Sequence, residues 1–159
     1  MQGIEVREAR DGDLSALDAS GLGPAAQRDF HTGLAYDALI ALDGDGAVLG
    51  RIYALYDDPR APLAELGFPR PHAWISFIDV LDGAQGRGIG RTIIGEFARR
   101  AAGLGVGGIG LLVEYAGDRA GRARFFSRCG LHEAWPGTTR DIFVGTPERV
   151  SACCGVPAP

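Results

Sequence analysis

A short glycine-rich turn in the second half of the chain holds the residues whose types and spacing could do chemistry. It reads Gln85-Gly86-Arg87-Gly88-Ile89-Gly90-Arg91 and stands between an apolar run, Ala73 to Leu81, and an amphipathic run. Because glycine has no side chain, a ligand can lie close to the backbone at three alternate positions. The helix expected next begins with unbonded N–H groups and a partial positive charge. The turn is therefore predicted to bind a diphosphate.

Two common nucleotide motifs fit this turn poorly. The mononucleotide P-loop, G-x-x-x-x-G-K-[ST], would place Gln85 where its first glycine belongs and Arg91 where its lysine belongs. The dinucleotide fingerprint, G-x-G-x-x-G, would place Arg91 at its third glycine, and it normally opens the first strand–helix unit of a domain. The sequence favours neither motif.

The turn resembles a third motif more closely. Gln85-Gly86-Arg87-Gly88-Ile89-Gly90 matches the Q/R-x-x-G-x-G/A motif of the GCN5-related N-acetyltransferase (GNAT) superfamily, and it stands between a central strand and a helix as it does there. Leu112-Val113-Glu114 and Phe125-Phe126-x-x-x-Gly130-Leu131 resemble a second region of that family. The resemblance covers residues 3 to 147. It implies a mixed α/β fold with a central mixed sheet of about seven strands flanked by about four helices.

The resemblance also implies an acyltransferase that takes acetyl-CoA, or another acyl-CoA, as co-substrate and needs no metal. The N–H groups from Gly86 to Arg91 would receive the pyrophosphate, and the backbone of Ile78 to Val80 would pair with the pantetheine arm as a strand would. Arg87 and Arg91 would add charge near the phosphates, although both could equally be solvated surface residues. The implied cofactor-binding residues are Ile78, Asp79, Val80, Gln85, Gly86, Arg87, Gly88, Ile89, Gly90, Arg91, Arg119 and Phe126.

Acyl transfer to an amine needs a base for the amine and a donor for the developing oxyanion. Many GNAT relatives place a glutamate early on the strand before the motif, but Trp74 stands at that position here. Others use a glutamate at the exit of the next strand, and Glu114 matches that position. Glu114 is therefore the expected base. Asp79 is the second catalytic candidate, because a carboxylate in so apolar a strand must be paired or face a cleft.

Two further positions depart from the family. Many relatives carry a tyrosine where this chain has Phe126, and its hydroxyl can protonate the leaving thiolate. Asparagine is common where Arg119 stands. A thiol pKa near about 8.5 makes thiolate a tolerable leaving group without that hydroxyl. The expected activity is transfer to a small-molecule amine. Transfer to a protein amine, transfer from a carrier-protein thioester and a catalytically silent CoA-binding module remain open.

The elements that position these residues follow from the hydrophobic pattern and the turns. The predicted order is strand, two helices, a hairpin of two strands, a long loop, strand, helix, strand, helix and two strands, which is a mixed α/β fold. The loop, Asp57 to His72, has four prolines and is a candidate wall of the acceptor site. The second helix, expected from Pro24 to about Leu34, carries His31 as a weak candidate for function. Residues 1–150 are predicted to form a single domain and residues 151–159 a flexible tail.

Composition narrows the classes of partner. The chain has 159 residues and a net charge of −4, with no basic stripe that would indicate nucleic-acid binding. The longest uncharged run, residues 101–113, is shorter than the roughly 18 residues that a membrane span needs, so no membrane association is expected. The N-terminus lacks the pattern of a signal peptide, which predicts a cytoplasmic protein. The three cysteines make neither a disulfide framework nor a metal site, and a homodimer is left open.

Overall fold

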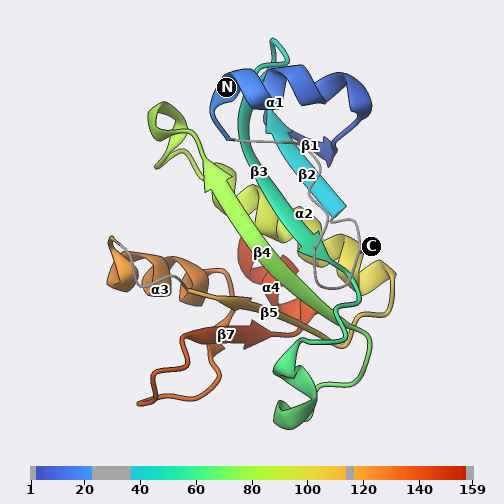
Figure 1. Ribbon diagram of the computed structural model, residues 1–159, viewed down its shortest axis with the longest axis vertical. Coiled ribbons are helices and arrows are strands. Elements are labelled where there is room, and N and C mark those ends of the chain that lie inside the picture. Colours follow the sequence, from blue (N-terminus) through green and yellow to red (C-terminus); the bar gives the residue numbers. More distant parts are fainter. Residues whose placement is uncertain (1–2, 23–36, 114–116, 157–159) are drawn as a thin grey trace.

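The computed structural model describes residues 3–22, 37–113 and 117–156, which build a mixed sheet with helices on both faces (Figure 1). The strands are β1 (Glu5–Glu8), β2 (Asp37–Leu42), β3 (Val48–Leu55), β4 (His72–Val80), β5 (Gly108–Leu112), β6 (His132–Glu133) and β7 (Ile142–Gly145). The α-helices are α1 (Leu14–Ser20), α2 (Ile89–Gly103), α3 (Arg119–Arg128) and α4 (Pro147–Cys154). Short 3₁₀ turns are η1 (Asp11–Asp13), η2 (Pro62–Leu66) and η3 (Asp82–Ala84).

The seven strands lie in the order β1-β2-β3-β4-β5-β7-β6. Every neighbouring pair is antiparallel except β4 and β5, which α2 connects as a parallel crossover. The hairpin of β2 and β3 turns at Asp43, whose carboxylate accepts hydrogen bonds from the N–H groups of Asp45 and Ala47, both at 2.9 Å. The mixed α/β class and the number of strands predicted from the sequence are confirmed.

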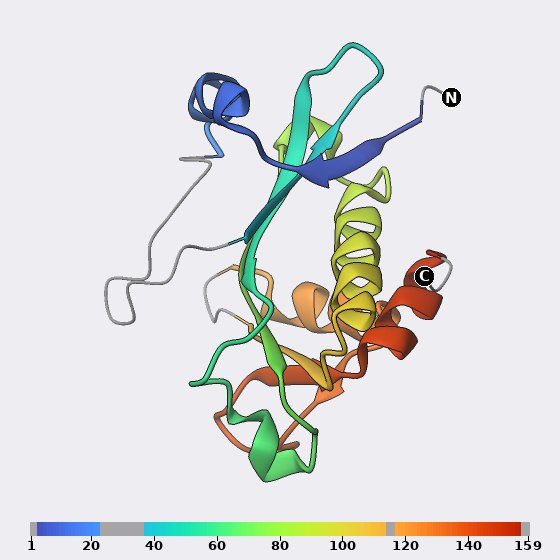
Figure 2. The same ribbon diagram turned by 90° about the vertical axis from the view of Figure 1, so that its right-hand side faces the viewer.

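Two layers cover the sheet. One face packs against α2, α3 and α4 in the main core, where α2 contributes Ile89, Ile93, Ile94 and Phe97. The other face carries α1 over β2 and β3, and η2 over β5 and β7. Figure 2 shows α1 and α2 on opposite sides of the strands. The side chains of β2 alternate between the two faces of the sheet, as the pleat of a strand requires. Leu39 and Ala41 enter the main core, while Ile40 and Leu42 pack under α1.

Strand β4 carries a bulge and then leaves β5. Its register against β3 shifts between Tyr53, which faces Phe77, and Ala54, which faces Ile75, so Ser76 is an extra residue. Pairing of β4 with β5 ends at Ile75. From residue 76 to 80, β4 therefore pairs with β3 alone among the described residues. Backbone N–H and C=O groups on its other side face the gap that opens between β4 and β5.

The expectation of a flexible tail is wrong for residues 151–156. Residues 147–154 form α4, which packs on α2, with Val150 and Ser151 buried. Thr146 caps the helix by accepting a hydrogen bond from the N–H of Arg149, and Pro147 occupies the first turn. Thr-Pro-Glu is a typical helix start, so the sequence does carry a local signal for α4. The Ser151 hydroxyl then donates to the Val156 carbonyl at 2.8 Å.

Two other expectations concern one loop and one helix. The loop from Asp57 to His72 folds around η2 and packs Ala61 and Leu63 against β7, with a cis peptide bond before Pro71. It lines neither of the two cavities described below, so the structure gives it no place as their wall. The helix expected from Pro24 to about Leu34, with His31, falls outside the described residues.

Candidate functional site

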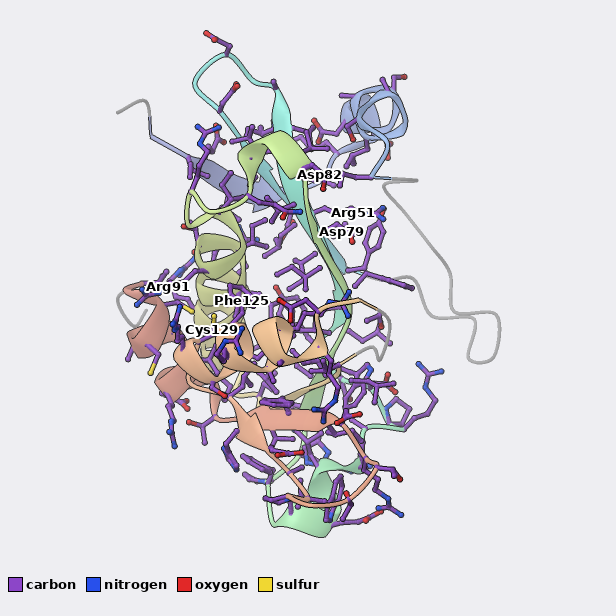
Figure 3. The ribbon with its side chains drawn as sticks, turned by 90° about the vertical axis from the view of Figure 1, so that its left-hand side faces the viewer. Arg51, Asp79, Asp82, Arg91, Phe125 and Cys129 are labelled. Atoms are coloured by element: carbon purple, nitrogen blue, oxygen red, sulfur yellow. The ribbon has the colours of Figure 1, made fainter. Side chains whose placement is uncertain are left out.

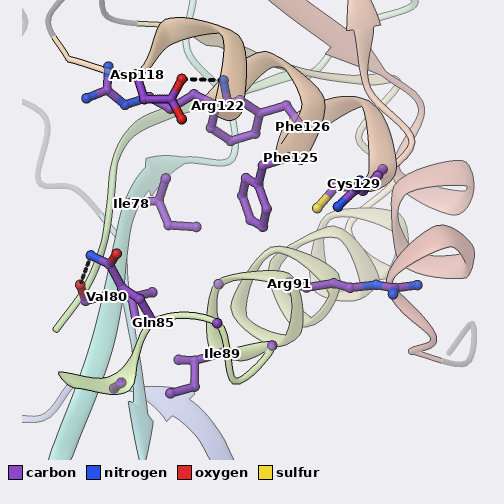
Figure 4. A pocket seen from close by; sticks show the side chains of 16 residues that line it. Ile78, Val80, Gln85, Ile89, Arg91, Asp118, Arg122, Phe125, Phe126 and Cys129 are labelled. Atoms are coloured by element: carbon purple, nitrogen blue, oxygen red, sulfur yellow. Dashed lines mark hydrogen bonds between the residues drawn. The ribbon is translucent and has the colours of Figure 1, made fainter. Parts of the chain in front are cut away.

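A cavity of about 690 Å³ lies between the second half of β4, the turn that starts α2, and α3 (Figure 4). Three segments far apart in the chain form its walls. The lining residues are Ile78 and Val80 of β4; Ala84, Gln85, Gly86, Gly88, Ile89, Gly90 and Arg91 around the turn; and Asp118, Gly121, Arg122, Phe125, Phe126, Arg128 and Cys129 of α3 and its ends. Nine of the predicted cofactor-binding residues are in this lining.

The glycine turn presents backbone donors to this cavity. Gly88 is the N-cap of α2 and has φ 82°, a left-handed conformation that favours glycine. The ladder of the helix begins with Thr92, whose N–H donates to the Gly88 carbonyl at 3.0 Å. The N–H groups of the first turn before Thr92 have no acceptor within the helix. A Cβ added at Gly88 would meet nothing within 4 Å, so the space beside its Cα is open.

The polar side chains around the turn either bond to other parts of the protein or are exposed. The Gln85 amide donates to the Val80 carbonyl at 3.3 Å and to Asp82 Oδ1 at 3.1 Å, so it ties the turn back to β4. Arg87 is exposed and outside the lining. Arg91 lines the cavity, but its side chain runs toward α4, where it donates to the Cys153 carbonyl (Figure 4). The backbone, rather than the two arginines, supplies the positive end of this site.

Helix α3 forms a wall of the large cavity, of which the sequence predicted only Phe126. Asp118 caps it by accepting from the N–H of Gly121 at 2.8 Å. Phe125 projects from it onto the turn, so closely that a Cβ at Gly90 would lie 3.2 Å from Phe125 Cζ. Asp118, Arg122, Phe125 and Cys129 follow at helical spacing. That spacing was the available signal, but nothing in it distinguishes a cavity wall from an ordinary core face.

A second cavity of about 110 Å³ lies in the gap between β4 and β5. It shares Ile78, Arg122 and Phe126 with the larger cavity, so the two spaces meet at these residues. Its other lining residues are Ile75, Ser76, Phe77, Asp79, Leu111, Leu112 and Val113. Phe77 is 43% exposed and Leu112 is 57% exposed, and Leu104 is the one other exposed large hydrophobic residue in the described part of the chain. Exposed apolar side chains gathered in a hollow are typical of a binding site.

Asp79 lies in this second cavity and not in the first. Its Oδ2 accepts hydrogen bonds from Arg51 Nε at 3.1 Å and Nη2 at 3.0 Å. The Arg51 guanidinium also lies 4.7 Å from the centre of the Tyr53 ring. Figure 3 shows Arg51 and Asp79 on the side of β4 away from Phe125 and Cys129. Alternation along β4 explains this, because Ile78 and Val80 face the large cavity while Phe77 and Asp79 face the other side.

Three predicted residues have other surroundings. Arg119 does not line either cavity, and it forms an ion pair with the buried carboxylate of Asp141. Phe126 is buried and stands where the two cavities meet, in edge contact with Phe125 at a ring distance of 5.2 Å. Glu114, the expected base, lies outside the described residues, directly after Val113 in the chain.

The protein family follows from a comparison with models of known families. The model of the acetyltransferase (GNAT) family matches residues 6–131, which is most of the chain. The protein belongs to the GNAT family. The predicted recognition and the predicted enzyme class, an acyltransferase, are confirmed. No curated protein sequence matches the chain. The motif residues, the gap between β4 and β5 and the large cavity all fall inside the matched region.

Solved structures of GNAT proteins resemble the fold at low sequence identity. A GNAT family N-acetyltransferase (YhbS) of Escherichia coli in complex with CoA is 19% identical, with a TM-score of 0.62 over 99% of this chain and 88% of that one. A spermidine N-acetyltransferase (SpeG) mutant of Vibrio cholerae is 13% identical, with a TM-score of 0.64 over 92% and 95%. Naa20 of Chaetomium thermophilum, in complex with a bisubstrate analogue, is 19% identical, with a TM-score of 0.59 over 93% and 88%. At these identities the likeness establishes the shared GNAT fold.

A separate observation concerns membranes. In residues 3–22, 37–113 and 117–156, no helix is both long enough and apolar enough to span a bilayer.

Proposed function

We propose that this GNAT protein transfers an acetyl or other short acyl group from acyl-CoA to the amine of a small molecule, by direct attack while both are bound. The observation that carries the proposal is the pair of cavities that meet at Ile78, Arg122 and Phe126. One cavity has backbone donors for phosphate, and the other is small and combines apolar side chains with the polar Ser76 and Asp79. Two substrates could therefore meet in the gap between β4 and β5 without competing for one space.

CoA fits the large cavity by its chemistry. The first-turn N–H groups of α2 would hold the diphosphate, in the open space beside Gly88. The side of β4 that faces the gap, from Ile78 to Val80, would pair with the amides of pantetheine. Acyl-CoA supplies an activated thioester, and the unpaired backbone beside the bulge at Ser76 offers N–H donors where negative charge develops on its carbonyl oxygen. Arg87 and Arg119 stand outside this lining, which makes them the weakest of the predicted contacts.

Glu114 is the proposed base. Val113, which precedes it in the chain, lines the small cavity. A carboxylate there would take a proton from the acceptor ammonium, directly or through water, since the amine attacks only when neutral. Asp79 is the alternative, but its carboxylate already pairs with Arg51. We assign Asp79 to the acceptor site because it lines the small cavity.

Phe126 is consistent with departure of the thiolate without a tyrosine hydroxyl. The side chain stands at the junction of the two cavities and offers no proton. Ser127, the other donor that the sequence offers, is exposed and lines neither cavity. A water molecule would then be the donor, or the thiolate leaves unassisted. The same residue motivates the second candidate function, a CoA-binding module without catalysis. Transfer to a protein amine and transfer from a carrier-protein thioester are the rivals within catalysis, and the cytoplasmic location stays a prediction.

Binding and turnover separate these functions. Acetyl-CoA is expected to bind by isothermal titration calorimetry under both the enzyme and the module proposals, and absence of binding at millimolar ligand would contradict both. Mass spectrometry of reactions with polyamines, aminoglycosides and amino acids should then show an acetylated product. A peptide amine panel tests the protein-acceptor rival in parallel. Binding without any product on these panels would favour the silent module.

Matched variants test the two carboxylates. Glu114→Gln should lower kcat by about a hundredfold, the contribution typical of a general base, with little change in CoA affinity. Asp79→Asn should mainly raise the KM for the amine. Unchanged turnover in Glu114→Gln would remove it as the base, and a large loss of kcat in Asp79→Asn would transfer the role to Asp79.

A further inference from the structure

The small cavity between β4 and β5 is bordered by two large apolar side chains that stay exposed. They are Phe77 of β4 and Leu112 of β5, and both line the cavity. The neighbouring Leu111 is buried in the main core, so Leu112 lies on the opposite face of the sheet, which is also the face of Phe77 and Asp79. Two strands thus present apolar surface to the same hollow.

This face of β5 is also apolar next to Leu112. Gly110 stands two positions before Leu112 and therefore lies on the same face. A Cβ added at Gly110 would lie 2.8 Å from both Leu63 Cδ1 and Trp74 Cζ3, so these two side chains fill the space over that residue. Leu63 and Trp74 belong to the hydrophobic cluster under η2. The exposed side chain of Leu112 therefore continues an apolar surface.

The charge in this hollow is already balanced. Among the described residues that line the small cavity, Asp79 is the one carboxylate, and its Oδ2 accepts from both Nε and Nη2 of Arg51. The Arg51 guanidinium lies over the Tyr53 ring, and that ring contacts Phe77 edge-on at a centroid distance of 6.5 Å. Arg122 adds a positive charge to the lining. A second ammonium group would therefore lose its hydration here without an unpaired carboxylate among these residues to replace it.

We propose that the acceptor is a monoamine whose nitrogen is attached to a compact alkyl group. This inference rests on the function proposed above and names the substrate class of the same site. The alkyl group would lie against Phe77 and Leu112, with the nitrogen at the junction of the two cavities. The cavity volume of about 110 Å³ is below the roughly 150 Å³ of an apolar cavity that holds benzene, which favours an alkyl chain over a large ring system. Transfer forms the C–N bond of an N-alkylacetamide and breaks the C–S bond, and the proton that the nitrogen loses ends on the CoA thiol.

A matched pair of amines tests this preference. Pentylamine and 1,4-diaminobutane have chains of equal length and differ at one end, where a methyl group replaces an ammonium group. In the wild type, kcat/KM for pentylamine should exceed that for 1,4-diaminobutane by at least about tenfold, because the methyl group gains from contact with apolar surface while the ammonium group is desolvated. In the series from ethylamine to pentylamine, kcat/KM should rise by up to about fourfold for each methylene that becomes buried.

Matched variants locate the preference. Leu112→Asn exchanges an apolar side chain for a polar one of similar size, and it should lower the ratio of kcat/KM between the two amines by about fourfold or more. The KM for acetyl-CoA should stay constant, since Leu112 does not line the large cavity. Leu104→Asn is the control, because Leu104 is 61% exposed at the end of α2 and lines neither cavity. It should keep the wild-type ratio. Phe77→Asn repeats the test from β4, and it decides the matter if thermal unfolding shows that Leu112→Asn is not folded.

Two results would overturn the inference. One is a kcat/KM for 1,4-diaminobutane that equals or exceeds that for pentylamine in the wild type. The other is an equal change of the ratio in Leu112→Asn and Leu104→Asn. Failure of the proposed function gives a different pattern: no acetylated amine forms, while calorimetry of the CoA-saturated protein still shows pentylamine binding at least about ten times more tightly than 1,4-diaminobutane. Absence of both acetylation and binding for these amines would overturn the inference together with the proposed function.

Discussion

Replacement of Gly88 by alanine should weaken CoA binding more than it weakens the fold. Gly88 has φ 82°, and an alanine Cβ there would meet no protein atom within 4 Å. The cost to the folded chain is therefore backbone strain alone, about 1–2 kcal/mol. For a chain of this size the melting temperature should fall by about 2–8 °C. The methyl group would occupy the space proposed for the diphosphate, and loss of one charge-assisted hydrogen bond of about 1.5–3 kcal/mol raises Kd by roughly 10- to 150-fold.

Gly46 supplies a matched control, because it has φ 83° in the β2–β3 hairpin and is equally free of neighbours within 4 Å. Gly46→Ala should lose the same stability and keep wild-type affinity for CoA, since it lines neither cavity. Thermal unfolding measures the first effect and titration calorimetry of the unliganded protein the second. Equal affinity losses in the two variants, or wild-type affinity in Gly88→Ala, would refute the assignment of the diphosphate to this turn.

Three further outcomes follow from particular contacts. Phe126→Tyr should raise kcat by about tenfold if protonation of the thiolate limits turnover, and an unchanged kcat would show that the leaving group needs no acid. Val150→Ala should cost about 2 kcal/mol in urea unfolding because Val150 is a fully buried residue of α4, whereas Arg149→Ala, at an exposed position of the same helix, should stay within about 0.5 kcal/mol. The Arg7 guanidinium, 2.7 Å from Asp13, lowers the pKa of that carboxyl to about 2. Because the folded pKa is below the unfolded one, this pair stabilises the fold above about pH 4 and stops doing so as the pH falls toward 2. At pH 7 Asp13→Asn should therefore cost about 1 kcal/mol after screening by solvent, and the difference from wild type should vanish near pH 2.

Local signals in the sequence predicted the glycine turn and the strand and helix on either side of it well. The turn from Gln85 to Arg91 was readable because glycine positions, the preceding apolar strand and the following helix are all neighbours in the chain. The sheet was readable for the same reason, since alternation in β2 and the Asp43 turn of the hairpin are local patterns. The helix α4 was also encoded locally, by Thr146 and Pro147, but the two cysteines at its end and the prolines after it favoured a flexible tail.

What could not be predicted depends on contacts between distant segments. Arg51 and Asp79 are 28 residues apart, and only the register of β3 against β4 makes them a pair. The resemblance to the GNAT family implies that Arg119 contacts the cofactor. Its ion-pair partner in the structure is Asp141, which follows β6 in the chain. The role of α3 as a wall depends on how far Phe125 reaches toward Gly90, which is a matter of packing and not of pattern.

The two substrates would be recognised by different kinds of chemical group. This difference explains why the sequence indicates a donor and does not identify the acceptor. A diphosphate and a chain of amides can be held by backbone groups, whose geometry depends on a few glycines and on a strand left without a neighbour. An acceptor amine is recognised by side chains, and in the small cavity these come from β4, β5 and α3 together. Phe77, Leu112 and Asp79 can each change without disturbing the backbone that would hold CoA. Specificity for the acceptor should therefore respond to substitutions at these three positions while the affinity for CoA stays constant.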